Sequence, residues 1–237
     1  MLLRLDRILS ETGLYTRREA KMLVQCGRVT ADGQIVPRPD EKLDPETNVI
    51  CVDGKPVVYQ KYVYLMMNKP AGFVSAREDA RDRAVTELLK APYSGRGLFP
   101  AGRLDKDSEG LLLLTDDGAF CHNVISPKKH VKKTYYVETE GALTEADVQA
   151  FKEGITLKDG TACLPGKLEI LESGEKSKAH VVITEGKYHQ VKRMLTSLGK
   201  PVVILKRLSI GGLPLDNALK PGEYRELSLA ELDKIFK

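Results

Sequence analysis

The chain has 237 residues, of which 42% are hydrophobic and 30% are charged, and its formal net charge is +4. This length suits one medium domain plus a small one, and the composition is typical of a soluble globular protein rather than a disordered or membrane-embedded one. The total charge is too small to indicate binding to a polyanion, so any such argument depends on where the charges lie.

Neither a membrane span nor an export signal is visible. The longest apolar run, at 110–115, has only the length of a strand. Arg4, Asp6 and Arg7 interrupt the apolar residues of the N-terminal segment, so we expect a cytoplasmic protein with no membrane partner. The four cysteines and four histidines lack metal-ligand spacing, which predicts free thiols and no metal site.

The N-terminal part predicts two helices followed by a hairpin. Apolar residues recur with helical spacing over 5–9. The segment TRREAKMLVQCG, at 16–27, predicts a second helix, since Thr16 and Glu19 have the spacing of a capping box. An Asp-Gly pair at 32–33 between two β-like runs is typical of a hairpin.

The same part is rich in basic residues, with seven Lys or Arg against four Asp or Glu over 1–38. Two helices, a hairpin and a basic helix face, over about residues 1–50, resemble the S4 RNA-binding domain. The resemblance implies contacts to the phosphates and shape of structured RNA, although each basic side chain could instead simply be solvated. The residues expected to contact RNA are Arg4, Arg7, Arg17, Arg18, Lys21 and Arg28.

We expect residues 1–60 to form this domain with its linker, and residues 61–237 to form a larger second domain. In the second domain, segments rich in Val, Ile, Tyr and Thr alternate with shorter helical patterns. Two of those patterns, at 144–154 and 188–199, end in Gly as helices commonly do. This order predicts an α+β fold around a mixed, mostly antiparallel sheet.

The segment PAGRLDKDSEGLLLLTDDG, at 100–118, places Arg103 and Asp105 directly before an apolar strand. A guanidinium and a carboxylate are costly at such a position unless they are paired, hydrogen-bonded or used. From spacing alone, a structural ion pair and a functional carboxylate both remain open for Asp105. Asp116 and Asp117 are explained by the turn or helix cap that ends the strand.

Four other motifs accompany GRLD along the chain. They are NKP at 68–70, KTYYV at 133–137, KYHQVKRM at 187–194 and IGGL at 210–213. In this order, they resemble the RsuA-type pseudouridine synthases, which join an N-terminal S4 domain to a two-lobed catalytic domain. The resemblance spans essentially the whole chain and implies isomerisation of a uridine in ribosomal RNA to pseudouridine.

The resemblance also implies roles for individual residues. Asp105 is expected to be the nucleophile, either attacking the ribose C1′ or starting loss of the base to a glycal-like intermediate. Lys192, with Arg193 as the alternative, is expected to keep Asp105 ionised, although either residue could instead contact an RNA phosphate. Tyr135 is expected to stack on the uracil and help remove its C5 proton, and Arg103 to hold the target nucleotide out of the stack.

Other residues have supporting roles. Tyr136 is expected in the core on the opposite face of its strand, and His189 is expected to be structural, because nothing in the sequence places a nucleophile beside it. No cofactor or metal is implied, since the isomerisation is internal to one nucleotide. The further residues expected to contact RNA phosphates are Lys128, Lys129, Lys132, Lys133 and Arg193, and Lys69 is expected either to do the same or to support the pocket.

Within the family, the likeness is to enzymes of small-subunit RNA. It implies a monomer that modifies uridine 516 of 16S RNA in a small-subunit assembly intermediate. A synthase for 23S RNA would share the chemistry, and a non-catalytic S4-type RNA-binding protein would explain the basic N-terminus but not GRLD. A glycoside hydrolase usually needs two facing carboxylates, which only Asp107 or Asp116 could supply together with Asp105.

Overall fold

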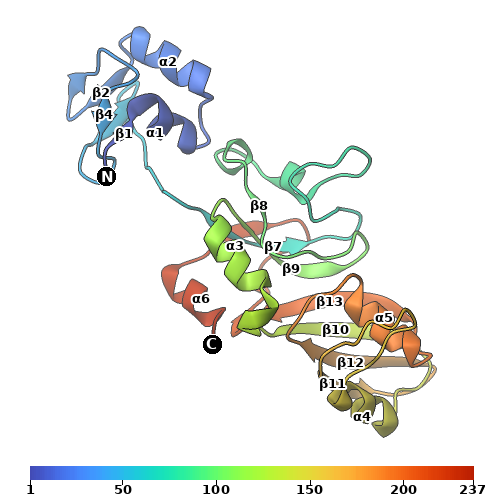
Figure 1. The fold of residues 1–237 in the computed structure, drawn as a ribbon. Coiled ribbons are helices and arrows are strands. Elements are labelled where there is room, and N and C mark those ends of the chain that lie inside the picture. Colours follow the sequence, from blue (N-terminus) through green and yellow to red (C-terminus); the bar gives the residue numbers. More distant parts are fainter. The chain divides into compact units, whose positions relative to one another are not determined.

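The computed structural model describes all 237 residues, which form two compact units. Unit 1 comprises Met1–Val63 and Thr86–Phe99, and unit 2 comprises Tyr64–Val85 and Pro100–Lys237 (Figure 1). No helix in either unit is long and apolar enough to cross a membrane. The domain boundary expected after residue 60 stays a prediction.

Unit 1 contains the expected helices and hairpin. Helices α1 and α2 bury their apolar faces in one core, beside a four-stranded sheet of order β3-β2-β5-β6 and the pair β1-β4. The elements are β1 (Leu3–Arg4), α1 (Leu5–Glu11), α2 (Arg17–Gln25), β2 (Val29–Ala31), β3 (Gln34–Ile35), β4 (Lys42–Leu43), β5 (Ile50–Val52), β6 (Lys55–Pro56) and the 3₁₀ turn η2 (Tyr93–Gly95).

Local signals explain where these elements begin and turn. The Oγ1 of Thr16 accepts from the backbone N–H of Glu19 at 3.2 Å, and the Glu19 carboxylate accepts from the Thr16 N–H at 2.7 Å. This is the predicted capping box. Asp32 and Gly33 have φ of 52° and 80°, the left-handed conformation that a two-residue hairpin turn needs.

Unit 2 is built on a nine-stranded sheet whose main order is β11-β12-β10-β13-β9-β7-β15, with β14 beside β13 and β8 beside β9. Among the pairings along the main order, only β13 with β9 is parallel, so the sheet is mixed and mostly antiparallel, as predicted. The strands are β7 (Tyr64–Lys69), β8 (Phe99–Pro100), β9 (Glu109–Thr115), β10 (Lys133–Glu140), β11 (Lys167–Glu172), β12 (Lys176–Ile183), β13 (Val202–Ile210), β14 (Leu213–Pro214) and β15 (Tyr224–Glu226).

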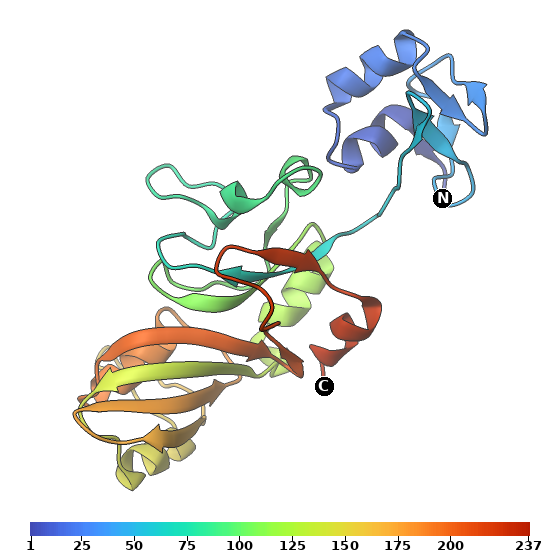
Figure 2. The ribbon, with the colours of Figure 1, turned by 180° about the vertical axis from the view of Figure 1, so that it is seen from behind.

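Two apolar cores divide unit 2 into the predicted two lobes. Helices α4 and α5 pack on strands β10 to β13, which lie side by side in Figure 2, and α3 and α6 pack beside β7 and β9 (Figure 1). The parallel β13–β9 pair joins the lobes. The helices and the 3₁₀ turn of unit 2 are α3 (Gly118–Ile125), η3 (Pro127–Lys129), α4 (Glu145–Glu153), α5 (Gln190–Ser197) and α6 (Leu229–Lys234), and the 3₁₀ turn η1 (Val85–Leu88) lies where the chain passes from unit 2 to unit 1.

Strand β10 alternates strictly between buried and more exposed positions. Lys133, Tyr135 and Val137 are buried on one face, so Tyr135 and Tyr136 point to opposite faces, as expected. The expectation that Tyr136 lies in the core is wrong. Its ring is only half-buried, and its hydroxyl donates to Glu138 at 2.7 Å, so it belongs to a polar face.

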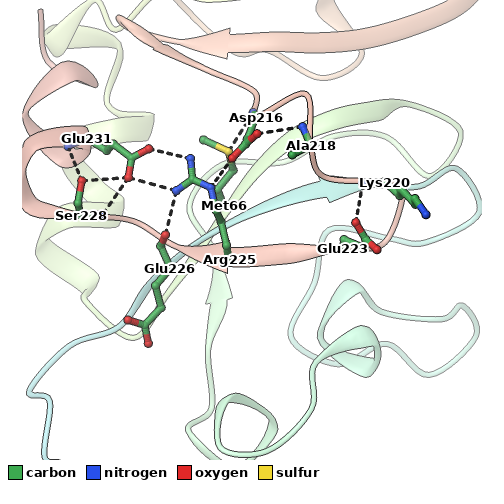
Figure 3. A network of polar contacts seen from close by, with 9 residues as sticks. All are labelled: Met66, Asp216, Ala218, Lys220, Glu223, Arg225, Glu226, Ser228 and Glu231. Carbon is green, nitrogen blue, oxygen red and sulfur yellow. Dashed lines mark hydrogen bonds and ion pairs between the residues drawn. The ribbon is translucent and has the colours of Figure 1, made fainter.

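An arginine fixes the C-terminal end of unit 2. The guanidinium of Arg225 donates to Asp216 at 2.6 Å and makes a bidentate contact with Glu231, at 2.7 and 3.1 Å (Figure 3). Glu231 also accepts from the backbone N–H of Ser228, which caps α6. The hydrogen bonds from Arg225 lower the pKa of Glu231 to about 2. The network joins strand β15 to the start of α6.

Candidate active site

The GRLD loop connects β8 to β9 and leaves Asp105 at the mouth of the buried strand. The Asp105 side chain is 22% exposed, which keeps it accessible but largely shielded from water. The buried Ser75 hydroxyl donates to the Leu104 carbonyl at 2.8 Å and accepts from the Leu104 N–H at 3.0 Å. The carbonyl of Asp105 accepts from the Ser108 N–H at 3.1 Å. The backbone on both sides of the carboxylate is therefore held in place.

Lys69, at the end of β7, supports the loop from within the protein. Its side chain is fully buried, and Nζ donates to the carbonyls of Ser108 at 2.7 Å, Pro70 at 3.1 Å and Lys106 at 3.3 Å. Burial lowers its pKa to about 8. Of the two roles expected for Lys69, the RNA contact is wrong, because its ammonium group is enclosed by backbone carbonyls, and the supporting role agrees with these contacts.

Arg207, on β13, is a second buried cation beneath the loop. Its residue is 2% exposed, Nε donates to the Leu111 carbonyl at 2.8 Å, and Nη1 donates to the Arg103 carbonyl at 3.5 Å. Sequence reasoning gave this residue no role, although an arginine inside an apolar strand pattern was an available signal. It ties β13 to the residue two positions before Asp105.

The start of α5 brings positive charge to the carboxylate. Lys192 Nζ lies 3.6 Å from Asp105 Oδ2, whereas Arg193 forms an ion pair with Asp159 at 2.5 Å. Of the two predicted partners, Lys192 is therefore the one that faces Asp105. His189 Nε2 lies 3.4 Å from Asp105 Oδ1, which overturns the expectation that nothing nucleophilic lies beside this histidine.

Lys192 is shared between two carboxylates. Its ammonium group also donates to Asp107 Oδ1 at 2.5 Å, a shorter contact than the one with Asp105. This hydrogen bond is the main reason that the pKa of Asp107 lies below its usual range. One lysine thus contacts two carboxylates at the site.

Tyr135 is 7% exposed and lies on β10, opposite Arg207 of β13. It belongs to the same apolar core as Leu104, the residue before Asp105. Arg103 is exposed to solvent, with its backbone carbonyl engaged by Arg207. The structure therefore brings Lys192 to Asp105 and buries Tyr135 in the core that contains Leu104, whereas Arg103 is exposed.

The predicted basic track after α3 divides into exposed and buried positions. Lys128, Lys129 and Lys132 are exposed and available to RNA phosphates. Lys133 is only 8% exposed, and its Nζ donates to the Val124 carbonyl at 3.4 Å. Burial lowers its pKa to about 8. Its predicted RNA contact is wrong, because β10 turns this side chain inward.

All six basic residues predicted to contact RNA in unit 1 are exposed. Three of them pair with acidic neighbours: Arg4 with Asp6, Arg7 with Glu11, and Arg28 with Asp53. The other three, Arg17, Arg18 and Lys21, lie on α2 and have no ion pair. Their RNA contacts stay a prediction.

Known proteins share both parts of this chain. A family model for RNA pseudouridylate synthase matches residues 63–197, and a model for the S4 domain matches residues 3–49. An uncharacterized RNA pseudouridine synthase of Bacillus subtilis is 46% identical over 231 residues, 97% of either chain. Ribosomal small subunit pseudouridine synthase A of Vibrio parahaemolyticus is 40% identical over 99% of this chain and 100% of its own. A crystal structure of a pseudouridylate synthase, 37% identical, superposes with a TM-score of 0.69 over 98% of this chain and 99% of its own.

Proposed function

Because this chain belongs to the RNA pseudouridylate synthases and begins with an S4 domain, we propose that it converts one uridine of 16S ribosomal RNA to pseudouridine. The family resemblance expected from the motifs is confirmed, and the protein is an RNA pseudouridine synthase, an isomerase. This excludes a glycoside hydrolase and a non-catalytic RNA-binding protein. The 16S target is supported by relatives named for the small subunit, and uridine 516 is the position that the resemblance implies.

The observation that carries the proposed chemistry is the placement of Asp105. Its carboxylate is largely shielded from water and lies on a fixed loop, with the ammonium group of Lys192 at 3.6 Å to balance the charge of a nucleophile. In the reaction, the N1–C1′ bond breaks, the uracil turns, and a C5–C1′ bond forms. The C5 proton is lost and N1 regains one, so the nucleotide keeps its composition. Attack at C1′ and formation of a glycal-like intermediate both begin at this carboxylate.

We assign supporting roles to two neighbours. Tyr135 lies in the same core as Leu104, and its ring suits stacking against an extruded uracil, with its hydroxyl taking part in removal of the C5 proton. Arg103 is exposed two residues before Asp105, where its guanidinium can fill the place of the extruded nucleotide and contact flanking phosphates. We also propose that the enzyme acts as a cytoplasmic monomer on a small-subunit assembly intermediate.

The test is to map pseudouridine in 16S and 23S RNA from cells that lack this protein. The cells are complemented with the wild type or with Asp105→Asn, which preserves the shape of the side chain but not its charge. The proposal expects one 16S site to be lost and restored only by the wild type. Loss of a 23S site would overturn the target, and no lost site would overturn the ribosomal assignment. A site restored by Asp105→Asn would overturn the role of this carboxylate.

A further inference from the structure

Tyr188 displays an aromatic ring beside the proposed nucleophile. The residue is 75% exposed, although the next residue, His189, contacts Asp105. The rings of Tyr188 and His189 are stacked, with centroids 3.9 Å apart and an interplanar angle of 16°. The imidazole therefore covers one face of the tyrosine ring, and the other face is open to solvent.

Buried polar contacts fix the turn that carries Tyr188. Gln190 and Glu185 are both buried, and the Gln190 amide donates to Glu185 at 2.7 Å while accepting from the Lys187 N–H at 2.9 Å. His189 has a left-handed φ of 48°, which is uncommon for residues other than glycine. The exposed ring is thus presented by a rigid turn rather than by a loose loop.

The cations around Tyr188 are already paired. Lys187 pairs with Glu185 at 2.9 Å, Lys192 with Asp107 at 2.5 Å, and Arg193 with Asp159 at 2.5 Å. All three of these cations are therefore neutralised by carboxylates and are not free to bind RNA phosphates. The exposed group of this segment is the aromatic ring of Tyr188. An aromatic face can stack on any nucleobase, whatever its identity.

We propose that the open face of Tyr188 is a stacking site for a nucleobase next to the target uridine. This inference rests on the proposed extrusion of that uridine toward Asp105. Extrusion deprives the neighbouring bases of a stacking partner, and a ring one residue from His189 can replace it. His189 connects the stacking site to the proposed nucleophile, since its ring lies against Tyr188 and its Nε2 lies 3.4 Å from Asp105.

The chain has no tryptophan, so Tyr188→Trp introduces a single fluorophore at the site. We expect its emission to be quenched when the variant binds the ribosomal transcript, 16S or 23S, that the wild type modifies. Phe236→Trp is the matched control, because Phe236 is a half-exposed aromatic residue packed on Phe120 of α3. Its emission should remain unchanged.

Activity is measured as tritium released from transcripts labelled at uridine C5, because that proton leaves in the reaction. Tyr188→Phe should keep kcat/KM within about twofold of the wild type, whereas Tyr188→Ala should lower it roughly 5- to 100-fold with an unchanged melting temperature. Equal activity of the Ala variant, or unquenched emission from the Tyr188→Trp variant, would overturn the stacking site. Release by the wild type from neither transcript would overturn the proposed function and this site with it.

Discussion

Lys192 forms its shorter contact, at 2.5 Å, with Asp107 and not with the proposed nucleophile, Asp105. The contact with Asp105 is 3.6 Å. The position of the ammonium group is therefore set by one carboxylate while its charge acts on two. The Asp107 side chain is 74% exposed and the Asp105 side chain 22%, so the ammonium group contacts one exposed and one shielded carboxylate.

Replacing Lys192 with Met should lower kcat on the order of 100-fold, as for the loss of one electrostatic contact in other active sites. Of the two side chains that contact the Asp105 carboxylate, only His189 would then remain. Lys192→Arg keeps the charge and should lose less than about tenfold, because its planar group fits the site differently. Lys178→Met, which breaks an exposed pair with Glu172, is the control for charge loss. Equal kcat for Lys192→Met and the wild type would remove Lys192 from the mechanism.

Ser75 should prove important for both stability and turnover. Ser75→Ala leaves the buried N–H and carbonyl of Leu104 without their partner, which should cost about 1–3 kcal/mol of unfolding free energy. The loosened loop should also lower kcat, since Asp105 follows directly. Denaturant unfolding and single-turnover assays measure the two effects. Ser94→Ala, at an exposed serine, should change neither, and a full kcat for Ser75→Ala would show that the loop is fixed by other contacts.

Local sequence signals determine much of this fold. Thr16 with Glu19 marks the start of α2, and Asp32-Gly33 marks a hairpin, because each signal depends on neighbours in the chain. The two-residue period of β10 was also readable. It places Lys133 on the same face as the buried Tyr135, so the sequence pattern alone indicates that Lys133 points inward.

The cations under the GRLD loop could not be found in this way. Arg207 reaches the carbonyl of Leu111 across 96 positions, through the parallel pairing of β13 with β9. His189 meets Asp105 only because the turn before α5 lies against the loop. No local period encodes which strand ends meet, so the order of motifs indicated the family while the supporting contacts required the folded chain.

Lys133→Met should stabilise the protein near pH 7 by about 1–3 kcal/mol, since it replaces a poorly paired buried charge with an apolar chain of similar size. The native pKa of about 8 lies below the usual 10.5. Between these values, the unfolded chain binds more protons than the native one, so wild-type stability rises with pH. The advantage of Met should therefore shrink as pH increases from about 8 to 10.5, as thermal unfolding can measure.

The same variant tests the corrected RNA contact. Lys133→Met should leave KM for RNA unchanged, whereas Lys132→Met removes an exposed charge one residue earlier and should raise KM. A raised KM for Lys133→Met together with an unchanged KM for Lys132→Met would mean that Lys133 turns outward when RNA binds. Salt titrations add an independent readout, because only the loss of a phosphate contact reduces the salt dependence of binding.

Glu231→Gln should lower the unfolding free energy at pH 7 by about 1–2 kcal/mol, a value discounted for partial solvent exposure. Arg225 holds the native pKa of Glu231 at about 2, below its ordinary value of 4.5, so the stabilisation is complete above pH 4.5. It is lost as pH falls from 4.5 toward 2, because the unfolded state takes up the proton first. The wild type and the variant should therefore converge in acid, which urea unfolding at several pH values can follow. Glu145→Gln is the control, since Glu145 is an exposed glutamate in the first turn of α4, far along the chain from Arg225. A difference that stays constant down to pH 2 would show that Glu231 acts through packing rather than through its charge.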